Sequence, residues 1–161
     1  MTHSRPGPET RTVVFVCTGN TCRSPMAKAL LDEAAAAKRL DIVAESAGLS
    51  ANGGAPATDN ACAAMRKLGL DISSHRSGRL TREMVDGADL ILAMSAVHRG
   101  RIAASFPEAR GKLAVLGDYA GLKGDVDDPF GGTPEDYDRC AEQLSRLVTA
   151  LCDRLALPPS S

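Results

Sequence analysis

The chain has 161 residues, 43% of them hydrophobic and only 3% aromatic, and its formal net charge is −1 at pH 7. That length suits one domain whose core is built mainly from alanine, valine, leucine and isoleucine. The near-zero charge argues against a nucleic-acid partner or an anionic membrane surface, and no apolar run approaches the roughly 20 residues of a membrane span.

The five cysteines are odd in number and show none of the paired spacings of a zinc site. We therefore expect reduced thiols, no metal, no cofactor and a cytoplasmic location, since the N-terminus also lacks the apolar segment of a signal peptide. We expect a monomer, because no heptad pattern is visible. Residues 1–11 are polar and rich in proline and glycine, which predicts a flexible leader, followed by one domain over 12–157 and a C-terminal tail over 158–161.

The first third of the chain predicts a buried strand followed by a helix. Val13–Val16 is the strand, and Ser24 and Pro25 are predicted as the N-cap and first residue of a helix that runs to Lys38. The apolar face predicted for this helix contains Met26, Ala29, Leu30, Ala34 and Ala37.

The rest of the chain continues the alternation of strands and helices. Further strands are predicted over 41–46, 88–94 and 113–116, and further helices over 58–68, 95–106 and from 133 onward. Ala47-Gly48 is predicted as a turn, and His98 is predicted to lie on the surface of its helix. Without a repeat or a linker, this order predicts a single-domain α/β fold, a doubly wound sheet of four parallel strands flanked by helices.

The loop between the first strand and the first helix carries the residues of an anion site. Gly19 and Asn20 suit tight or left-handed backbone, and the helix N-terminus after them offers free amides to an anion. Cys17 faces this helix end and Arg23, which should lower its thiol pKa below the free value of about 8.5. Because Arg23 can hold two oxygens of one tetrahedral anion, the loop predicts a phosphate site with a cysteine nucleophile.

A long connection over 117–133 supplies the carboxylates. Among its aspartates, Asp128 precedes Pro129, which stiffens the backbone, and Phe130 is expected to shield the carboxyl from water and raise its pKa. Asp128 is therefore a candidate general acid, although the residues alone leave Asp127 open as the alternative. The spacing lacks the pattern of an EF-hand calcium loop.

Two of these segments resemble a known family. The run from Cys17 to Ala27, CTGNTCRSPMA, closely resembles the signature of the low-molecular-weight protein tyrosine phosphatases, and DPFGG over 128–132 resembles their general-acid loop. The similarity covers roughly residues 12–157 and implies a Rossmann-like phosphatase fold. It also implies that Cys17 forms a phosphocysteine, that Arg23 holds the phosphate oxygens and that Asp128 is the general acid.

The resemblance assigns further residues to the site. Ser24 would hydrogen-bond the thiolate, and Asn20, Ser46 and His75 would form a network that supports the phosphate loop. The substrate-binding residues would be Thr18, Gly19, Thr21, Cys22 and Phe130.

The substrate class expected from the resemblance is a phosphorylated protein, with phosphate and other oxyanions as inhibitors. Thr21 and the DPFGG sequence look most like the bacterial protein-arginine phosphatase branch, because tyrosine-directed members usually have an aliphatic residue in place of Thr21 and often a second aromatic after Phe130. A phosphotyrosine phosphatase is the alternative. An arsenate reductase would need two further cysteines, which residues 71–94 lack, and a non-catalytic phosphoprotein-binding module would have lost Cys17 or Asp128.

Cys22 has two readings. It could form a reversible disulfide with Cys17 that protects the nucleophile from over-oxidation, or it could be a small apolar loop residue.

Overall fold

The structure, a computed structural model, describes residues 10–157. The predicted tail and residues 1–9 of the predicted leader lie outside the described residues. Arg11, which was expected to belong to the leader, is the first residue of the first strand and extends the domain by one residue.

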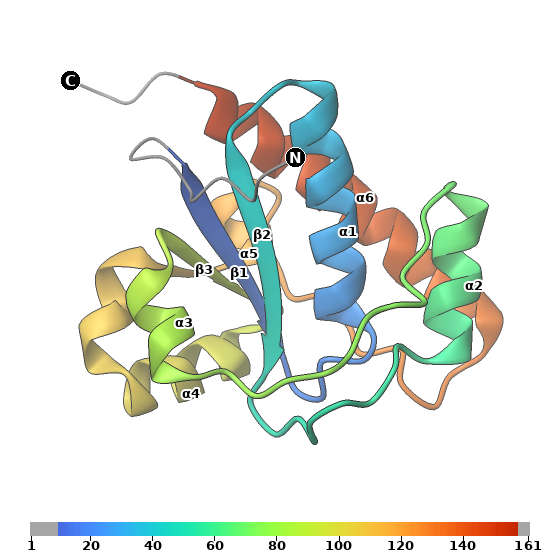
Figure 1. The fold of residues 1–161 in the computed structure, drawn as a ribbon, viewed down its shortest axis with the longest axis horizontal. Coiled ribbons are helices and arrows are strands. Elements are labelled where there is room, and N and C mark those ends of the chain that lie inside the picture. The colour runs from blue at the N-terminus through green and yellow to red at the C-terminus, as the bar shows by residue number, and fades with distance from the viewer. Residues whose placement is uncertain (1–9, 158–161) are drawn as a thin grey trace.

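Within the described residues, four parallel strands form one sheet, as predicted, and the strand order is β2-β1-β3-β4 (Figure 1). The strands are β1 (Arg11–Cys17), β2 (Ile42–Gly48), β3 (Leu90–Ala93) and β4 (Leu113–Val115). The helices are α1 (Arg23–Ala37), α2 (Asp59–Lys67), α3 (Arg82–Gly87), α4 (Ala96–Ser105), α5 (Leu116–Tyr119), α6 (Pro134–Ala156) and the 3₁₀ helix η1 (Pro107–Lys112).

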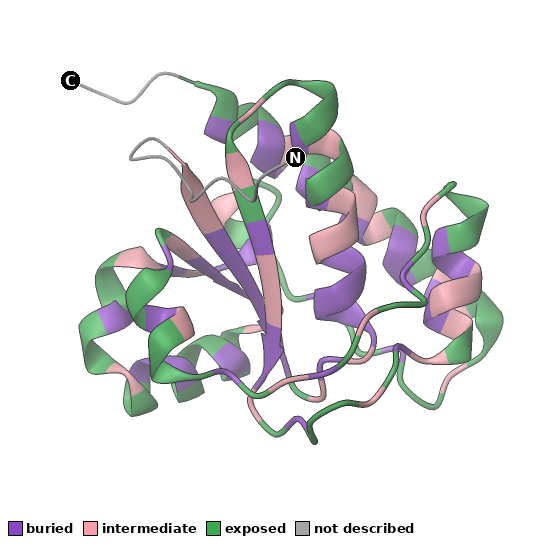
Figure 2. Ribbon diagram, in the orientation of Figure 1, coloured by how far each residue is buried: buried purple, intermediate pink, exposed green. Residues whose placement is uncertain are grey.

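The central strand β1 is buried on both faces, because successive side chains of a strand point to opposite sides of the sheet. Val13 and Phe15 pack with α1, α2 and α6 on one side, whereas Val14 and Val16 pack with α3 and α4 on the other. Figure 1 shows these two helical layers, and Figure 2 shows that burial is concentrated between them. The carboxyl end of β1 therefore emerges in the middle of the sheet, where ligands bind in folds of this kind.

The start of α1 differs from the prediction. The helix begins at Arg23 rather than Pro25, so Ser24 lies inside its first turn and is not the N-cap. Pro25 is tolerated there because the amides of the first helical turn have no partner within the helix.

The buried face of α1 was predicted in part. Met26 is buried, and Ala29, Leu30 and Ala34 are partly buried against the core as expected, whereas Ala37 is exposed. Leu31 and Ala35, which the prediction did not include, are buried. The helix is rich in alanine on all sides, so hydrophobic spacing does not determine which face meets the sheet. In α6 the predicted face is buried as expected, through Leu144, Leu147, Val148, Leu151 and Leu155.

Ala47 and Gly48 were predicted as a turn but are the last two residues of β2, where Gly48 pairs with Cys17. Its backbone also bridges to Arg79. The helices α5 and η1 were not predicted. Both are short and lie directly beside β4, where a sequence pattern has little length in which to repeat.

Candidate active site

The loop after β1 wraps around a pocket of about 200 Å³. Cys17 is the last residue of β1 and is 3% exposed, so its thiol lies at the end of a buried strand. The pocket is lined by Cys17, Thr18, Gly19, Asn20, Thr21, Cys22, Arg23, Asp128 and Phe130, which brings the expected nucleophile, acid and substrate-binding residues together.

The position of Ser24 explains why it does not cap α1. Its hydroxyl lies 2.9 Å from the Cys17 sulfur and accepts a hydrogen bond of 2.8 Å from the Asn20 amide. The hydroxyl also lies 3.5 Å from the Ala47 carbonyl oxygen, but the shorter contact to sulfur allows its hydrogen to be donated to a thiolate instead. Ser24 is fully buried, so this contact is sheltered from water.

Asn20 ties the loop to its surroundings. Its backbone has φ 58°, in the left-handed region that asparagine tolerates better than most residues. Its side-chain NH₂ donates to Ser46 at 3.0 Å as well as to Ser24, and its side-chain oxygen accepts from the Gly78 amide at 2.9 Å. Of the two residues predicted to adopt tight or left-handed backbone, Asn20 is the one with a positive φ, and Gly19 does not have one.

His75 supports Asn20 from the other side. Its Nε2 lies 2.6 Å from the Asn20 carbonyl oxygen, and since that oxygen can only accept, Nε2–H is the donor. Burial lowers the pKa of His75, so the neutral ring is favoured. Asn20, Ser46 and His75 thus form one hydrogen-bonded network around the phosphate loop.

Arg23 links the loop to the segment that carries Asp128. One guanidinium nitrogen donates to the carbonyl oxygen of Val126 at 2.9 Å. The Val126 amide in turn donates to the carbonyl oxygen of Met94, just beyond β3. The other terminal nitrogen lies 3.6 Å from a carboxylate oxygen of Asp128. Arg23 is almost completely buried, so it fixes the acid segment against the core.

Between the two candidate acids, the geometry favours Asp128. Asp128 lines the pocket and faces Arg23, whereas Asp127 lies outside the pocket lining. The second carboxylate oxygen of Asp128 accepts a hydrogen bond from the Phe130 amide at 3.0 Å, which fixes the direction of the Asp128 side chain. Phe130 is 68% exposed and the Asp128 side chain 50% exposed, so the prediction that Phe130 shields this carboxyl from water is wrong.

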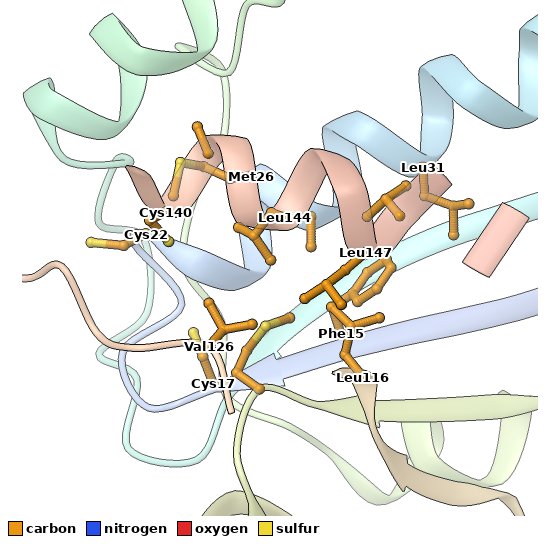
Figure 3. Close-up of a cluster of buried hydrophobic side chains, with 14 of the residues drawn as sticks. Phe15, Cys17, Cys22, Met26, Leu31, Leu116, Val126, Cys140, Leu144 and Leu147 are labelled. Atoms are coloured by element: carbon orange, nitrogen blue, oxygen red, sulfur yellow. The ribbon is translucent and has the colours of Figure 1, made fainter. Parts of the chain in front are cut away.

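The hydrophobic core extends to the part of the pocket where Cys17 lies. Figure 3 shows Cys17, Val126 and Met26 in one cluster with Leu144 and Leu147 of α6. Cys17 and the segment that carries Asp128 therefore rest on the same packed surface, which limits their relative motion.

Cys22 is buried beside α2 and α6. Its sulfur lies 3.5 Å from the Thr58 hydroxyl and 3.6 Å from the Tyr137 hydroxyl. All five thiols are free in the structure, and a reversible disulfide between Cys17 and Cys22 stays a prediction. Nearby Cys140 is a different case, because burial raises its pKa to about 12 and leaves it as an unreactive thiol.

His98 was predicted to lie on the surface, but it is only 5% exposed. Its Nε2 lies 2.8 Å from the Thr18 hydroxyl, and its Nδ1 lies 2.8 Å from the hydroxyl of Ser95, the N-cap of α4. Burial lowers the pKa of His98, with the charge of Arg23 as the next cause. Sequence reasoning missed this contact, although Ser95 and His98 follow β3 at the same sheet edge as Cys17.

Within residues 10–157, no group of three or more histidine, cysteine, aspartate or glutamate side chains is arranged to hold a metal ion. The same part of the chain contains no helix with the length and apolarity needed to cross a membrane.

A buried cysteine and arginine within one loop around a small pocket, with an aspartate opposite, define a site for cysteine-based phosphoryl chemistry. The profile of the family described as low molecular weight phosphotyrosine protein phosphatase matches residues 12–158. The chain belongs to this family.

Three relatives show how similar the chain is to known members. A protein-arginine-phosphatase from Geobacillus stearothermophilus is 40% identical over 145 residues, covering 89% of this chain and 95% of the relative. The structure of a YwlE arginine phosphatase, a cysteine-to-serine mutant with a phosphorylated active-site serine, has 39% identity and a TM-score of 0.87 over 89% of this chain and 95% of that one. A low molecular weight protein tyrosine phosphatase from T. tengcongensis has 42% identity and a TM-score of 0.87 over 90% of this chain and 99% of that one.

Proposed function

We propose that this protein is a cysteine-dependent protein phosphatase that removes phosphoryl groups from phosphoarginine residues. The observation that carries the proposal is the arrangement of Cys17, Arg23 and Asp128 around one pocket. The phosphorylated serine in the cysteine-to-serine relative supports a nucleophile that becomes phosphorylated during turnover. The five free thiols fit a reducing compartment, and we place the enzyme in the cytoplasm as a monomer.

In the first step, the Cys17 thiolate attacks phosphorus in line with the leaving nitrogen. A phosphorus–sulfur bond forms, the phosphorus–nitrogen bond breaks, and Asp128 gives its proton to the nitrogen. The loop amides and Arg23 hold the oxygens on which negative charge develops. The bond to Val126 uses only one of the five N–H donors of Arg23, and the terminal nitrogen that faces Asp128 can donate to the phosphoryl group.

In the second step, the Asp128 carboxylate takes a proton from water, and the water oxygen attacks phosphorus. The phosphorus–sulfur bond breaks and its electron pair returns to Cys17. The hydroxyl of Ser24, 2.9 Å from the sulfur, stabilises the departing thiolate by donating to it. Phosphate leaves, and the enzyme regains its starting protonation.

Thr21 supports phosphoarginine over phosphotyrosine. A guanidine is released only as a protonated group, because its conjugate acid has a pKa above about 12, and it needs polar partners in the pocket. Thr21 lines the pocket and offers a hydroxyl there, whereas an aliphatic residue would offer only bulk. Phe130 is followed by Gly131 rather than by a second aromatic ring, so the pocket has less surface against which a phenyl ring could stack.

Identity alone does not decide between the two substrates, since an arginine phosphatase and a tyrosine phosphatase match this chain almost equally well. The deciding experiment measures kcat/KM for a phosphoarginine peptide and a phosphotyrosine peptide of matched sequence. We expect at least a tenfold preference for phosphoarginine in the wild type and a shift toward phosphotyrosine in Thr21→Ile. Thr149→Ile, an exposed position on α6, is the control and should leave the ratio unchanged. A wild-type preference for phosphotyrosine would make the chain a tyrosine phosphatase.

A further inference from the structure

The side chain of His98 connects α4 to the phosphate loop. Strand β3 lies beside β1, and the Met94 amide just beyond β3 donates to Val16 at 3.1 Å. The first turn of α4 therefore begins next to the end of β1. From this turn the His98 ring reaches Thr18, the residue that follows Cys17.

The hydrogen bonds around Ser95 indicate which ring nitrogen of His98 carries the proton. The Ser95 hydroxyl oxygen already accepts from the His98 amide at 3.2 Å, as expected of an N-cap. Its hydrogen is then free to donate to Nδ1, 2.8 Å away. In a neutral imidazole with Nδ1 as acceptor, Nε2 carries the hydrogen and donates to the Thr18 hydroxyl oxygen.

In this arrangement the Thr18 hydroxyl oxygen accepts the hydrogen bond from His98, so the hydroxyl hydrogen of Thr18 is not used in that bond. Thr18 is exposed and lines the pocket, whereas His98 beneath it is buried. The backbone of Thr18 is fixed separately, because its carbonyl oxygen accepts from the Ser50 amide at 2.9 Å. The bond from His98 is thus not needed to hold the main chain, but it sets the direction of the side chain.

We propose that His98, held by Ser95, is a positioning residue that turns the Thr18 hydroxyl toward the bound substrate, where it donates to a phosphoryl oxygen. The inference rests on the proposed phosphatase function and adds Ser95 and His98 to the residues that support it. The loop is then supported from two sides, by Asn20 and His75 near β2 and by His98 near β3.

The test is a double-mutant cycle between residues 18 and 98. Thr18→Val removes the hydroxyl with little change in shape. His98→Asn keeps a group near the position of Nδ1 for Ser95 but is too short to reach Thr18. We expect each variant to lower kcat/KM about tenfold, on whichever of the two matched peptides the wild type hydrolyses, as is typical for one lost hydrogen bond to a charged group. The double variant should also lose about tenfold, because both changes remove the same interaction.

Rescue separates positioning from a general packing role. His98→Gln can place its amide where Nε2 lies, and it should recover kcat/KM to within about threefold of the wild type. If the two losses of kcat/KM multiplied in the double variant, to about a hundredfold in total, that result would overturn the inference. So would wild-type activity in Thr18→Val, or a fall in Tm that tracks the loss of activity across the series.

Orthovanadate affinity supplies a readout that does not need turnover. The same four proteins should show the same non-additive pattern in the Kd for vanadate, and additive changes in Kd would contradict the role of His98. A wild type that binds vanadate but hydrolyses neither peptide would instead refute the proposed function, and the cycle in Kd would still decide whether His98 positions Thr18.

Discussion

Replacing Gly48 with alanine tests how closely β2 supports the phosphate loop. A Cβ atom at this position would lie 2.6 Å from the Thr18 carbonyl oxygen, 2.9 Å from the Ala51 Cβ and 3.0 Å from the Asn20 amide nitrogen. Ordinary contact begins at 3.4 Å, so the Thr18 oxygen is about 0.8 Å too close. Two of the three atoms are main-chain atoms of the loop, which cannot yield as a flexible side chain would.

The loop must therefore move, and we expect two consequences of Gly48→Ala. Overpacking of this kind costs about 1–3 kcal/mol of stability. A displacement approaching 1 Å in a catalytic loop lowers activity about a hundredfold. The assay combines kcat/KM on the matched peptides with the free energy of unfolding from urea titration.

Gly78→Ala is the matched control for this change. The Gly78 amide also contacts Asn20, but no heavy atom of the described residues lies within 4 Å of a Cβ built on it. Gly78→Ala should keep kcat/KM within about threefold of the wild type. If Gly48→Ala were as active and as stable as Gly78→Ala, the close contact between β2 and the loop would not constrain the site.

Two further predictions concern the acid and the buried imidazoles. Asp128→Asn should lower kcat/KM by about 10²–10⁴-fold, as expected for loss of a general acid, whereas Asp127→Asn should stay within about threefold; the reverse order would assign the acid to Asp127. Burial lowers the pKa of His75 and His98 below the ordinary 6.5. As the pH decreases through 6.5, the unfolded chain therefore binds protons that the folded chain does not. The free energy of unfolding should fall over this pH range. Urea titrations between about pH 5.5 and pH 7.5 measure this slope, and His98→Gln should make it shallower; an equal slope in both proteins would show that His98 contributes nothing to it.

Much of the fold follows from sequence pattern because strands and helices here are strongly periodic or uniformly apolar. The apolar run Val13–Val16 predicted the strand that lies at the centre of the sheet, and the spacing of the leucines in α6 predicted the buried face of that helix. The site loop could be found for a similar reason, since Cys17 and Arg23 lie only six positions apart and between a strand and a helix.

What the sequence did not reveal depends on contacts between distant segments. Ser24 was assigned as an N-cap because serine before proline often is one, but its hydroxyl is used by Cys17 and Asn20 instead. Gly48 looked like a turn residue, whereas its lack of a side chain serves the close approach to Thr18. The contact of His98 with Thr18 spans 80 positions, and no local pattern encodes such a distance.

The central claim is that turnover passes through a phosphoryl group on Cys17. Rapid quenching of wild-type enzyme during turnover of the preferred peptide, followed by intact-protein and peptide mass spectrometry, tests it directly. We predict one added phosphoryl group, located on Cys17 and formed before phosphate is released, with the same adduct in Cys62→Ser as a control. Full turnover with no adduct on Cys17, or continued activity in Cys17→Ser, would contradict the mechanism.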